Sequence, residues 1–188
     1  LSLNDRVLSG DDYVVQGDTL VIPAAPANSV LKTEVRIHPA SNSALEGLYT
    51  SGAFLLTQCE AQGFRKITWF PDRPDVMTTY RVTLEADKSQ FPVLLSNGNL
   101  EKAGELPGGR HWVRWDDPFP KPSYLFALVA GDLGAVHDTF KTMSGREVAL
   151  GIYVLRGNEE RCAWAMESLK ESMLWDERRF GREYDLDV

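Results

Sequence analysis

The clearest regularity in the chain is an alternation of apolar and polar residues in two stretches. Residues 31–38 place Leu, Thr, Val and Ile at every second position, with Lys, Glu, Arg and His between them. Residues 79–86 alternate in the same way. Because successive side chains of a strand point to opposite faces, both stretches are predicted to be half-buried β-strands with one face in water.

Turn signals separate further runs that are rich in Val, Leu, Trp and Tyr. They lie at Gly17-Asp18, Asn97-Gly98 and Pro107-Gly108-Gly109. Such signals between strand-like runs favour tight reversals of an extended chain. The first 156 residues are therefore predicted to be mostly strands in antiparallel β-sheets, a mainly β fold of the saddle or sandwich kind.

The C-terminal part is predicted to be a hairpin followed by one long helix. The hairpin joins residues 137–141 to residues 146–155 across Met143-Ser144-Gly145. The helix has the expected end signals, which are Asn158 as a cap, Glu159 and Glu160 at the positive end of the dipole, Arg178 and Arg179 at the negative end, and Gly181 as the left-handed residue that ends it. Its apolar stripe, predicted to be core packing, comprises Cys162, Met166, Leu169 and Met173.

Composition and charge narrow the range of functions. A hydrophobic content of 43% over 188 residues is that of a globular protein with a sizeable core. The longest apolar run, Tyr124 to Ala130, is far shorter than the roughly 20 residues of a membrane helix. The net charge of −7 disfavours nucleic acid, because binding to phosphates needs clustered Lys and Arg. We therefore expect a soluble protein with neither nucleic acid nor membrane as a partner.

The Cys, His and Asp residues form no recognisable metal or catalytic motif. Cys59 and Cys162 are too far apart in sequence to suggest a disulfide framework and are expected to be free thiols. The histidines are isolated, and no His-Glu-x-x-His stands among them: they are His38, His111 and His137. Asp72 and Asp75 flank Arg73, which favours a local ion pair over acid–base catalysis. No catalytic residue and no metal ligand is predicted within the chain.

Residues 54–60 are the strongest candidate for a functional segment. Phe54, Leu55 and Leu56 are predicted to be a strand, and Gln58 and Glu60 follow where that strand should give way to a loop. The two-residue period of an extended chain puts Gln58 and Glu60 on one side and Cys59 on the other. We therefore expect an amide and a carboxylate to converge in a cleft.

Several short sequence blocks occur in a fixed order along the chain. Together they identify a protein family, whereas any one of them alone would be a weak signal. They are Leu45–Tyr49, Thr57–Glu60, Trp69–Asp75, Val76–Tyr80, Leu95–Asn99, Gly109–Val113, Asp117–Pro122, Ala127–Asp132 and Trp175–Gly181. This set resembles the N-terminal domain of the zinc aminopeptidase N family, in its bacterial form. The resemblance implies a domain boundary near Asp132, with an N-terminal β domain at 1–132 and the incomplete beginning of a thermolysin-like catalytic domain at 133–188. The start at Leu1 rather than Met also leads us to expect a piece of a longer protein or a cleaved terminus.

The resemblance also implies roles for two residues. A Glu at the position of Glu60 helps to bind the N-terminal amine of a peptide substrate, and the amide at the position of Gln58 lines the pocket for the first side chain. Hydrolysis in the parent enzyme is implied to use a zinc-activated water, a general-base Glu and an oxyanion-stabilising Tyr, all outside this chain.

Further expectations follow from the same resemblance. The cofactor is zinc, bound outside these residues, and the partners are the peptide substrate and the remaining catalytic and C-terminal domains of the same protein. The expected location is the bacterial cytoplasm, with peripheral membrane association as an alternative. The 188 residues alone are expected to be inert.

Two other functions stay open at this point. One is a stand-alone β-sandwich binding module that uses Trp69, Trp112 and Trp115 to hold a sugar or a peptide. The other is a relative of the same family that keeps this domain as an interaction scaffold without peptidase activity. Tryptophans in alternating strands are more often core residues than binding platforms, which weakens the first of these.

Overall fold

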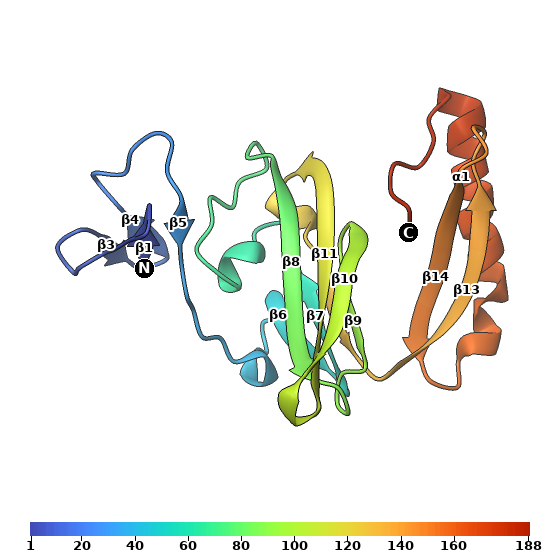
Figure 1. Cartoon of the computed structure of the whole chain (residues 1–188), viewed down its shortest axis with the longest axis horizontal. Helices are drawn as coiled ribbons and strands as arrows, with labels where there is room; N and C mark the ends of the chain where they lie inside the picture. Colours follow the sequence, from blue (N-terminus) through green and yellow to red (C-terminus); the bar gives the residue numbers. More distant parts are fainter.

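The computed structural model describes residues 1–188 and places three successive parts side by side along the longest axis of the molecule (Figure 1). Short N-terminal strands lie at one end, two antiparallel sheets form the middle, and a hairpin packed on a helix forms the other end. The predicted fold class, mainly β with antiparallel sheets and one long C-terminal helix, is confirmed.

The N-terminal part contains five short strands in two small sheets: β1 (Ser2–Leu3), β2 (Arg6–Val7), β3 (Val14–Gln16), β4 (Thr19–Val21) and β5 (Leu31–Lys32). β3 and β4 form a hairpin at the predicted Gly17-Asp18 turn. The strand predicted over 31–38 was wrong beyond Lys32. β5 pairs only with β1, in an antiparallel register that places Lys32 opposite Ser2, so residues 33–38 extend past the start of β1 and no strand lies beside them to exchange backbone hydrogen bonds.

The middle part consists of two antiparallel sheets. One sheet has the order β10 (Asn99–Leu106), β11 (Arg110–Lys121), β8 (Thr78–Asp87), and the other has the order β6 (Gly47–Ser51), β7 (Phe54–Gln58), β12 (Leu128–Gly131), β9 (Val93–Ser96). The strand predicted at 79–86 is β8, and its odd-numbered residues Arg81, Thr83 and Glu85 are exposed as expected. Pro107–Gly109 joins β10 to β11 as a hairpin. The turn at Asn97-Gly98 instead carries the chain from one sheet to the other.

The core of the middle part is a small cluster in which aromatic rings dominate. Its buried members are Cys59, Phe64 and Tyr80, and Ile67, Phe70, Val82 and Phe126 pack around them. Phe64 meets Phe70 and Phe126 edge to face, with ring centroids 4.9 and 5.0 Å apart. Such edge-to-face pairs add directional attraction to apolar burial, so this cluster holds the loop segments 59–70 and 122–127 against β8.

The C-terminal part is the hairpin β13 (Leu133–Lys141) and β14 (Glu147–Leu155) covered by α1 (Ala163–Phe180). Its core contains Phe140, Val148, Leu150 and Met166. The predicted stripe holds for Cys162, Met166 and Met173, but Leu169 is 37% exposed. Leu174 packs in its place, because the buried face of α1 is centred on Met166, Met173 and Glu177, and Leu169 lies toward the edge of that face.

The two ends of the helical segment differ in how well they were predicted. Gly181 is left-handed (φ 63°, ψ 31°), and its N–H donates to the Glu177 carbonyl at 2.9 Å, as expected. The side-chain cap by Asn158 was wrong. The chain enters through a 3₁₀ turn at Glu159–Cys162, and the Asn158 amide donates back to the Leu155 carbonyl at 3.3 Å. No helix combines the length and the apolar character needed to cross a bilayer.

The place where a domain boundary is predicted coincides with a change of sheet. β12 belongs to the four-stranded sheet and β13 to the hairpin, and Asp132 alone stands between them. Asp132 is held by an ion pair with Arg156 at 2.5 Å. The assignment of 1–132 and 133–188 to two domains stays a prediction.

Candidate functional site

Gln58 and Glu60 lie where the end of β7 passes into a turn, which we call the Glu60 turn (residues 59–63). Gln58 is the last residue of β7 and is exposed, Cys59 is only 3% exposed, and Glu60 is exposed again. Exposure therefore alternates across Gln58, Cys59 and Glu60 in the predicted sense. This alternation leaves the amide and the carboxylate accessible while the thiol between them is buried.

The two polar side chains are held differently. Gln58 Nε2 donates to the backbone carbonyl of Glu60 at 3.1 Å, so the amide closes over the backbone of the Glu60 turn. The peptide bond between Glu60 and Ala61 is cis. The Glu60 carboxylate makes no hydrogen bond and no ion pair within the chain. Because it is exposed and unpaired, the Glu60 carboxylate is free to bind a cationic group that does not belong to this chain.

Behind the turn, Cys59 and Tyr80 lie in the aromatic cluster. Burial, with a smaller contribution from the negative charge of Asp72, raises the pKa of the Cys59 thiol to about 11. The same two causes, in the same order, raise the pKa of Tyr80 to about 12, and its hydroxyl has no hydrogen-bond partner. Both groups are therefore neutral at physiological pH, and neither is a nucleophile or a general base.

The two carboxylates that flank Arg73 have different surroundings. The local ion pair expected there forms between Arg73 and Asp75, which are exposed and 2.6 Å apart. Asp72 is instead buried, and it accepts hydrogen bonds from Arg65 and from Ser123. Ser123 lies 51 positions further along the chain, so no local pattern could have revealed this contact.

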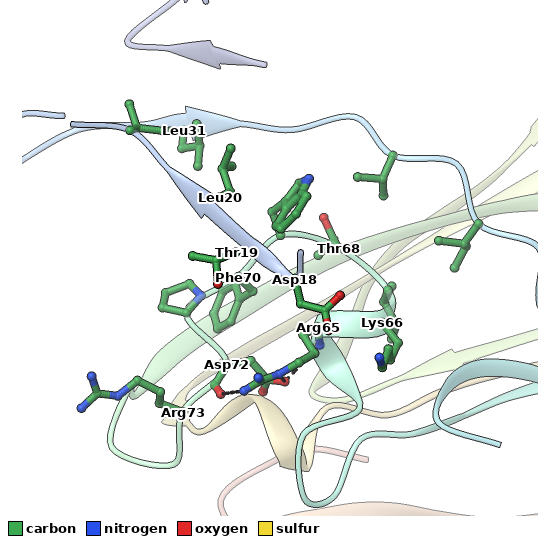
Figure 2. Close-up of a pocket in the computed structure, with 16 residues that line it drawn as sticks. Asp18, Thr19, Leu20, Leu31, Arg65, Lys66, Thr68, Phe70, Asp72 and Arg73 are labelled. Carbon is green, nitrogen blue, oxygen red and sulfur yellow. Dashed lines mark hydrogen bonds and ion pairs between the residues drawn. The ribbon is translucent and has the colours of Figure 1, made fainter. Parts of the chain in front are cut away.

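Beside this network is a groove of about 600 Å³ between the N-terminal strands and residues 65–73 (Figure 2). Leu20, Leu31 and Phe70 supply part of its apolar lining, and Arg65 and Asp72 lie at one side of it. Val35 and Ile37, from the segment that fails to form a strand, also line it. Gln58 and Glu60 do not line this groove, so the exposed carboxylate lies outside it.

His111, Trp112 and Trp115 have structural surroundings. His111 is buried with Nε2 2.7 Å from the Phe91 carbonyl oxygen, and Trp115 is buried and donates from Nε1 to the Leu94 carbonyl at 3.1 Å. Trp112 is half-buried, with the Arg114 guanidinium 5.5 Å from its ring. No three His, Cys, Asp or Glu residues gather where they could hold a metal ion. The residues of this chain therefore do not fit a zinc site.

Comparison with known proteins places the chain in one family. The profile of the peptidase M1 N-terminal domain matches residues 15–125. The chain is 58% identical to aminopeptidase N of Caulobacter vibrioides over 188 residues, which is 100% of this chain and 22% of that protein. It is 62% identical to aminopeptidase N of Escherichia coli over 169 residues, which is 90% of this chain and 19% of that protein.

A solved structure agrees with these sequence matches. The crystal structure of Legionella pneumophila aminopeptidase A in complex with aspartic acid superposes with a TM-score of 0.88 at 41% identity, covering 99% of this chain and 22% of that one. The chain thus spans about a fifth of the length of the relatives it matches. The family resemblance inferred from the sequence blocks is confirmed: the chain belongs to the peptidase M1 N-terminal domain family.

Proposed function

We propose that this chain is part of a zinc-dependent aminopeptidase and that it supplies residues that recognise the N-terminal amine of a peptide. Membership of the family and the aminopeptidase names of its relatives support the activity of the whole protein. One observation carries the residue assignment. The Glu60 carboxylate is exposed on a braced turn and has no cation of its own chain beside it.

The chemistry of the substrate fits this carboxylate. An α-amine has a pKa of about 7.7 to 8.0, so a large share of peptide N-termini are ammonium ions at neutral pH. An ammonium placed against Glu60 gains a charge-assisted hydrogen bond, which is stronger than a neutral one. The Legionella relative was crystallised with aspartic acid, a free amino acid that carries such an ammonium group, and this supports amine recognition within the family.

Gln58 complements Glu60. Its Nε2 is engaged with the Glu60 carbonyl, which leaves the amide oxygen free to accept a hydrogen bond. We assign this face of the amide to the pocket for the first side chain of the substrate. Gln58 thus has two roles, bracing the Glu60 turn and contacting the substrate.

Hydrolysis itself is assigned to other parts of the longer protein. The Cys, His, Asp and Glu residues here do not gather into a metal site, so we propose that the zinc ligands and the hydrolytic groups are outside these 188 residues. The contribution of this chain is to bind and orient the substrate. By the same reasoning, the chain alone binds no catalytic zinc and has no peptidase activity.

Substitution of Glu60 in the full-length enzyme tests the proposal. Glu60→Ala should leave the zinc content unchanged and lower kcat/KM for an aminoacyl amide by about 30- to 5,000-fold, equivalent to about 2 to 5 kcal/mol. Glu34→Ala is the control, because Glu34 is also an exposed carboxylate but lies outside the Glu60 turn. An unchanged kcat/KM in Glu60→Ala would refute the assignment of Glu60.

The same experiment separates the proposal from a non-catalytic scaffold. A full-length protein that binds no zinc and hydrolyses no aminoacyl amide would be the scaffold relative. Of the three tryptophans on which the alternative binding module depends, Trp115 is buried and hydrogen-bonded within the protein, so it is not available to a ligand.

A further inference from the structure

Asp72 joins three segments through one buried carboxylate. Its side chain is 2% exposed. Oδ2 accepts from the backbone N–H of Arg65 at 3.0 Å and from Arg65 Nε at 3.1 Å, and Oδ1 accepts from Ser123 Oγ at 2.5 Å. Arg65 Nη2 also donates to the Asp72 backbone carbonyl at 2.8 Å, and Figure 2 shows the guanidinium turned toward Asp72. The side chain of each residue therefore binds the backbone of the other.

The Arg65 side of this network is in direct contact with the Glu60 turn. Arg65 lies in a 3₁₀-helix at Phe64–Lys66 that follows the turn immediately. The N–H of Gly63 donates to the Cys59 carbonyl at 2.8 Å, closing the turn against the start of that helix. A Cβ placed on Gly63 would lie 2.2 Å from the Gln58 carbonyl oxygen, so no free space separates the helix from the end of β7. A shift of the Arg65 backbone is therefore passed to the turn.

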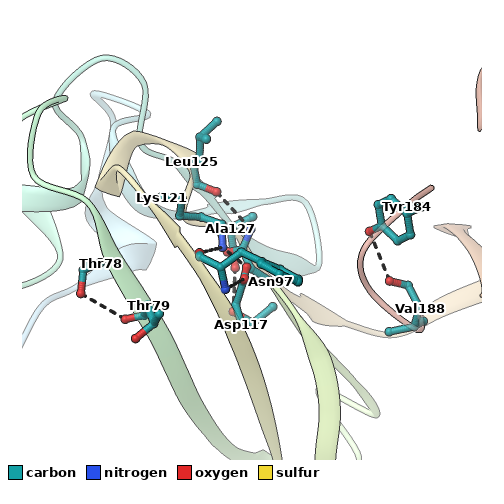
Figure 3. A network of polar contacts seen from close by, with 11 residues as sticks. Thr78, Thr79, Asn97, Asp117, Lys121, Leu125, Ala127, Tyr184 and Val188 are labelled. Carbon is teal, nitrogen blue, oxygen red and sulfur yellow. Dashed lines mark hydrogen bonds and ion pairs between the residues drawn. The ribbon is translucent and has the colours of Figure 1, made fainter. Parts of the chain in front are cut away.

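The Ser123 side is anchored to the sheets. Ser123 begins a 3₁₀-helix at Ser123–Leu125 in the connection from β11 to β12. Asn97 holds this connection by donating to the Leu125 carbonyl at 3.1 Å and accepting from the Ala127 N–H at 2.7 Å (Figure 3). The next residue, Leu128, donates from its N–H to Thr57 Oγ1 at 2.9 Å, one position before Gln58. The first residue after the connection is therefore hydrogen-bonded to β7, the strand that leads into the Glu60 turn.

The carboxylate of Asp72 is kept ionised at neutral pH despite its burial. Burial acts to raise its pKa, but the hydrogen bonds from Ser123 and Arg65 act in the opposite direction, and the net result is a lowered pKa. A charged acceptor binds its donors more strongly than a neutral one, so the junction between the two segments is stiff.

We propose that Asp72 is a positioning residue that fixes the direction of the Glu60 carboxylate by locking the Phe64–Lys66 helix to the β11–β12 connection. This inference rests on the proposed role of Glu60 in binding the substrate amine. Asp72 does not touch the substrate and acts only through the turn. Small misplacements of a charged contact weaken transition-state binding strongly, which gives the network a functional consequence beyond stability.

The first test compares two neighbouring Asp residues in the full-length enzyme. Asp72→Asn removes the charge that holds Arg65 and should lower kcat/KM for an aminoacyl amide by about tenfold or more, with zinc content unchanged. Asp75→Asn is the matched control, because it removes an exposed ion pair three positions away and should change kcat/KM less than about twofold. Equal effects of the two substitutions would overturn the inference.

The second test asks whether Asp72 acts through Glu60. If it does, adding Asp72→Asn to a Glu60→Gln enzyme should lower kcat/KM by less than about threefold further, because the contact that it positions is already lost. Losses that multiply in full would overturn the inference and leave the role of Glu60 standing. A Glu60→Gln enzyme with normal kcat/KM would overturn the proposed function, and this inference with it.

A milder substitution covers the case in which Asp72→Asn does not fold. Ser123→Ala removes one donor to Asp72 and leaves the ion pair with Arg65 in place. It should lower kcat/KM by a few-fold and show the same non-additivity with Glu60→Gln. Full additivity of Ser123→Ala and Glu60→Gln in the double variant would likewise overturn the inference.

Discussion

Gly63 is the position at which a single methyl group should do the most damage to the Glu60 turn. Its backbone is in the right-handed helical region (φ −78°, ψ −22°), which alanine adopts without strain. The obstacle is space. An added Cβ would lie 2.2 Å from the Gln58 carbonyl oxygen, 3.0 Å from Cys59 Cα and 3.0 Å from the Gly47 nitrogen. All three are backbone atoms, so no side chain can rotate away to relieve the contact.

The size of the effect follows from these contacts. A relaxed non-bonded contact needs roughly 3.5 Å, so the backbone of the turn or of β7 must move by about 1 Å. Overpacking of this kind costs about 1 to 3 kcal/mol. Alanine regains about 0.4 to 1 kcal/mol by restricting the unfolded chain, and weakening of the hydrogen bond from Gly63 to Cys59 costs about 1 kcal/mol. We expect Gly63→Ala to lower the free energy of unfolding by about 2 kcal/mol.

Urea unfolding followed by tryptophan fluorescence measures this difference. Gly10→Ala is the matched control, since no atom lies within 4 Å of a Cβ built on Gly10 and its φ is not positive. The control should be unchanged or slightly more stable. A Gly63→Ala protein as stable as the wild type would refute the close packing of the turn against β7. In the full-length enzyme, Gly63→Ala should also lower kcat/KM, because the displaced segment carries Glu60.

Two further predictions concern buried ionisable groups. The folded state lowers the pKa of Asp72, so its stabilisation should be present above the ordinary carboxyl pKa near 4 and lost as the pH falls through the lower folded value. The urea midpoint should therefore fall more steeply below about pH 5 in the wild type than in Asp72→Asn, and parallel curves would contradict this. With the pKa of Cys59 raised from 9.0 to about 11, the folded protein should hold about one hundredth of the ordinary thiolate fraction at pH 8. In a Cys162→Ser variant, a thiol reagent should label Cys59 at least about 100-fold more slowly in buffer than in urea, and equal rates would argue against its burial.

The local sequence pattern predicted correctly those features that depend only on neighbouring residues. The alternation over 79–86 became β8, the glycine signals at Gly17 and Pro107–Gly109 became hairpin turns, and Gly181 ended the helix in the left-handed conformation. The exposure of Gln58 and Glu60 around a buried Cys59 has the same origin. Each of these features follows from the period of the backbone or from the freedom of glycine, and both act over a few residues.

Long-range contacts settled the features that the pattern left open or misassigned. Residues 33–38 have a strand-like alternation but no neighbouring strand, so they line a groove and do not join a sheet. Asp72 binds Arg65 and Ser123, although Arg73 is its neighbour in sequence, because folding brings the β11–β12 connection against the 3₁₀-helix. A strand needs a partner and a buried charge needs several donors, and these come from distant parts of the chain. Their identity therefore depends on how the sheets and loops meet in space.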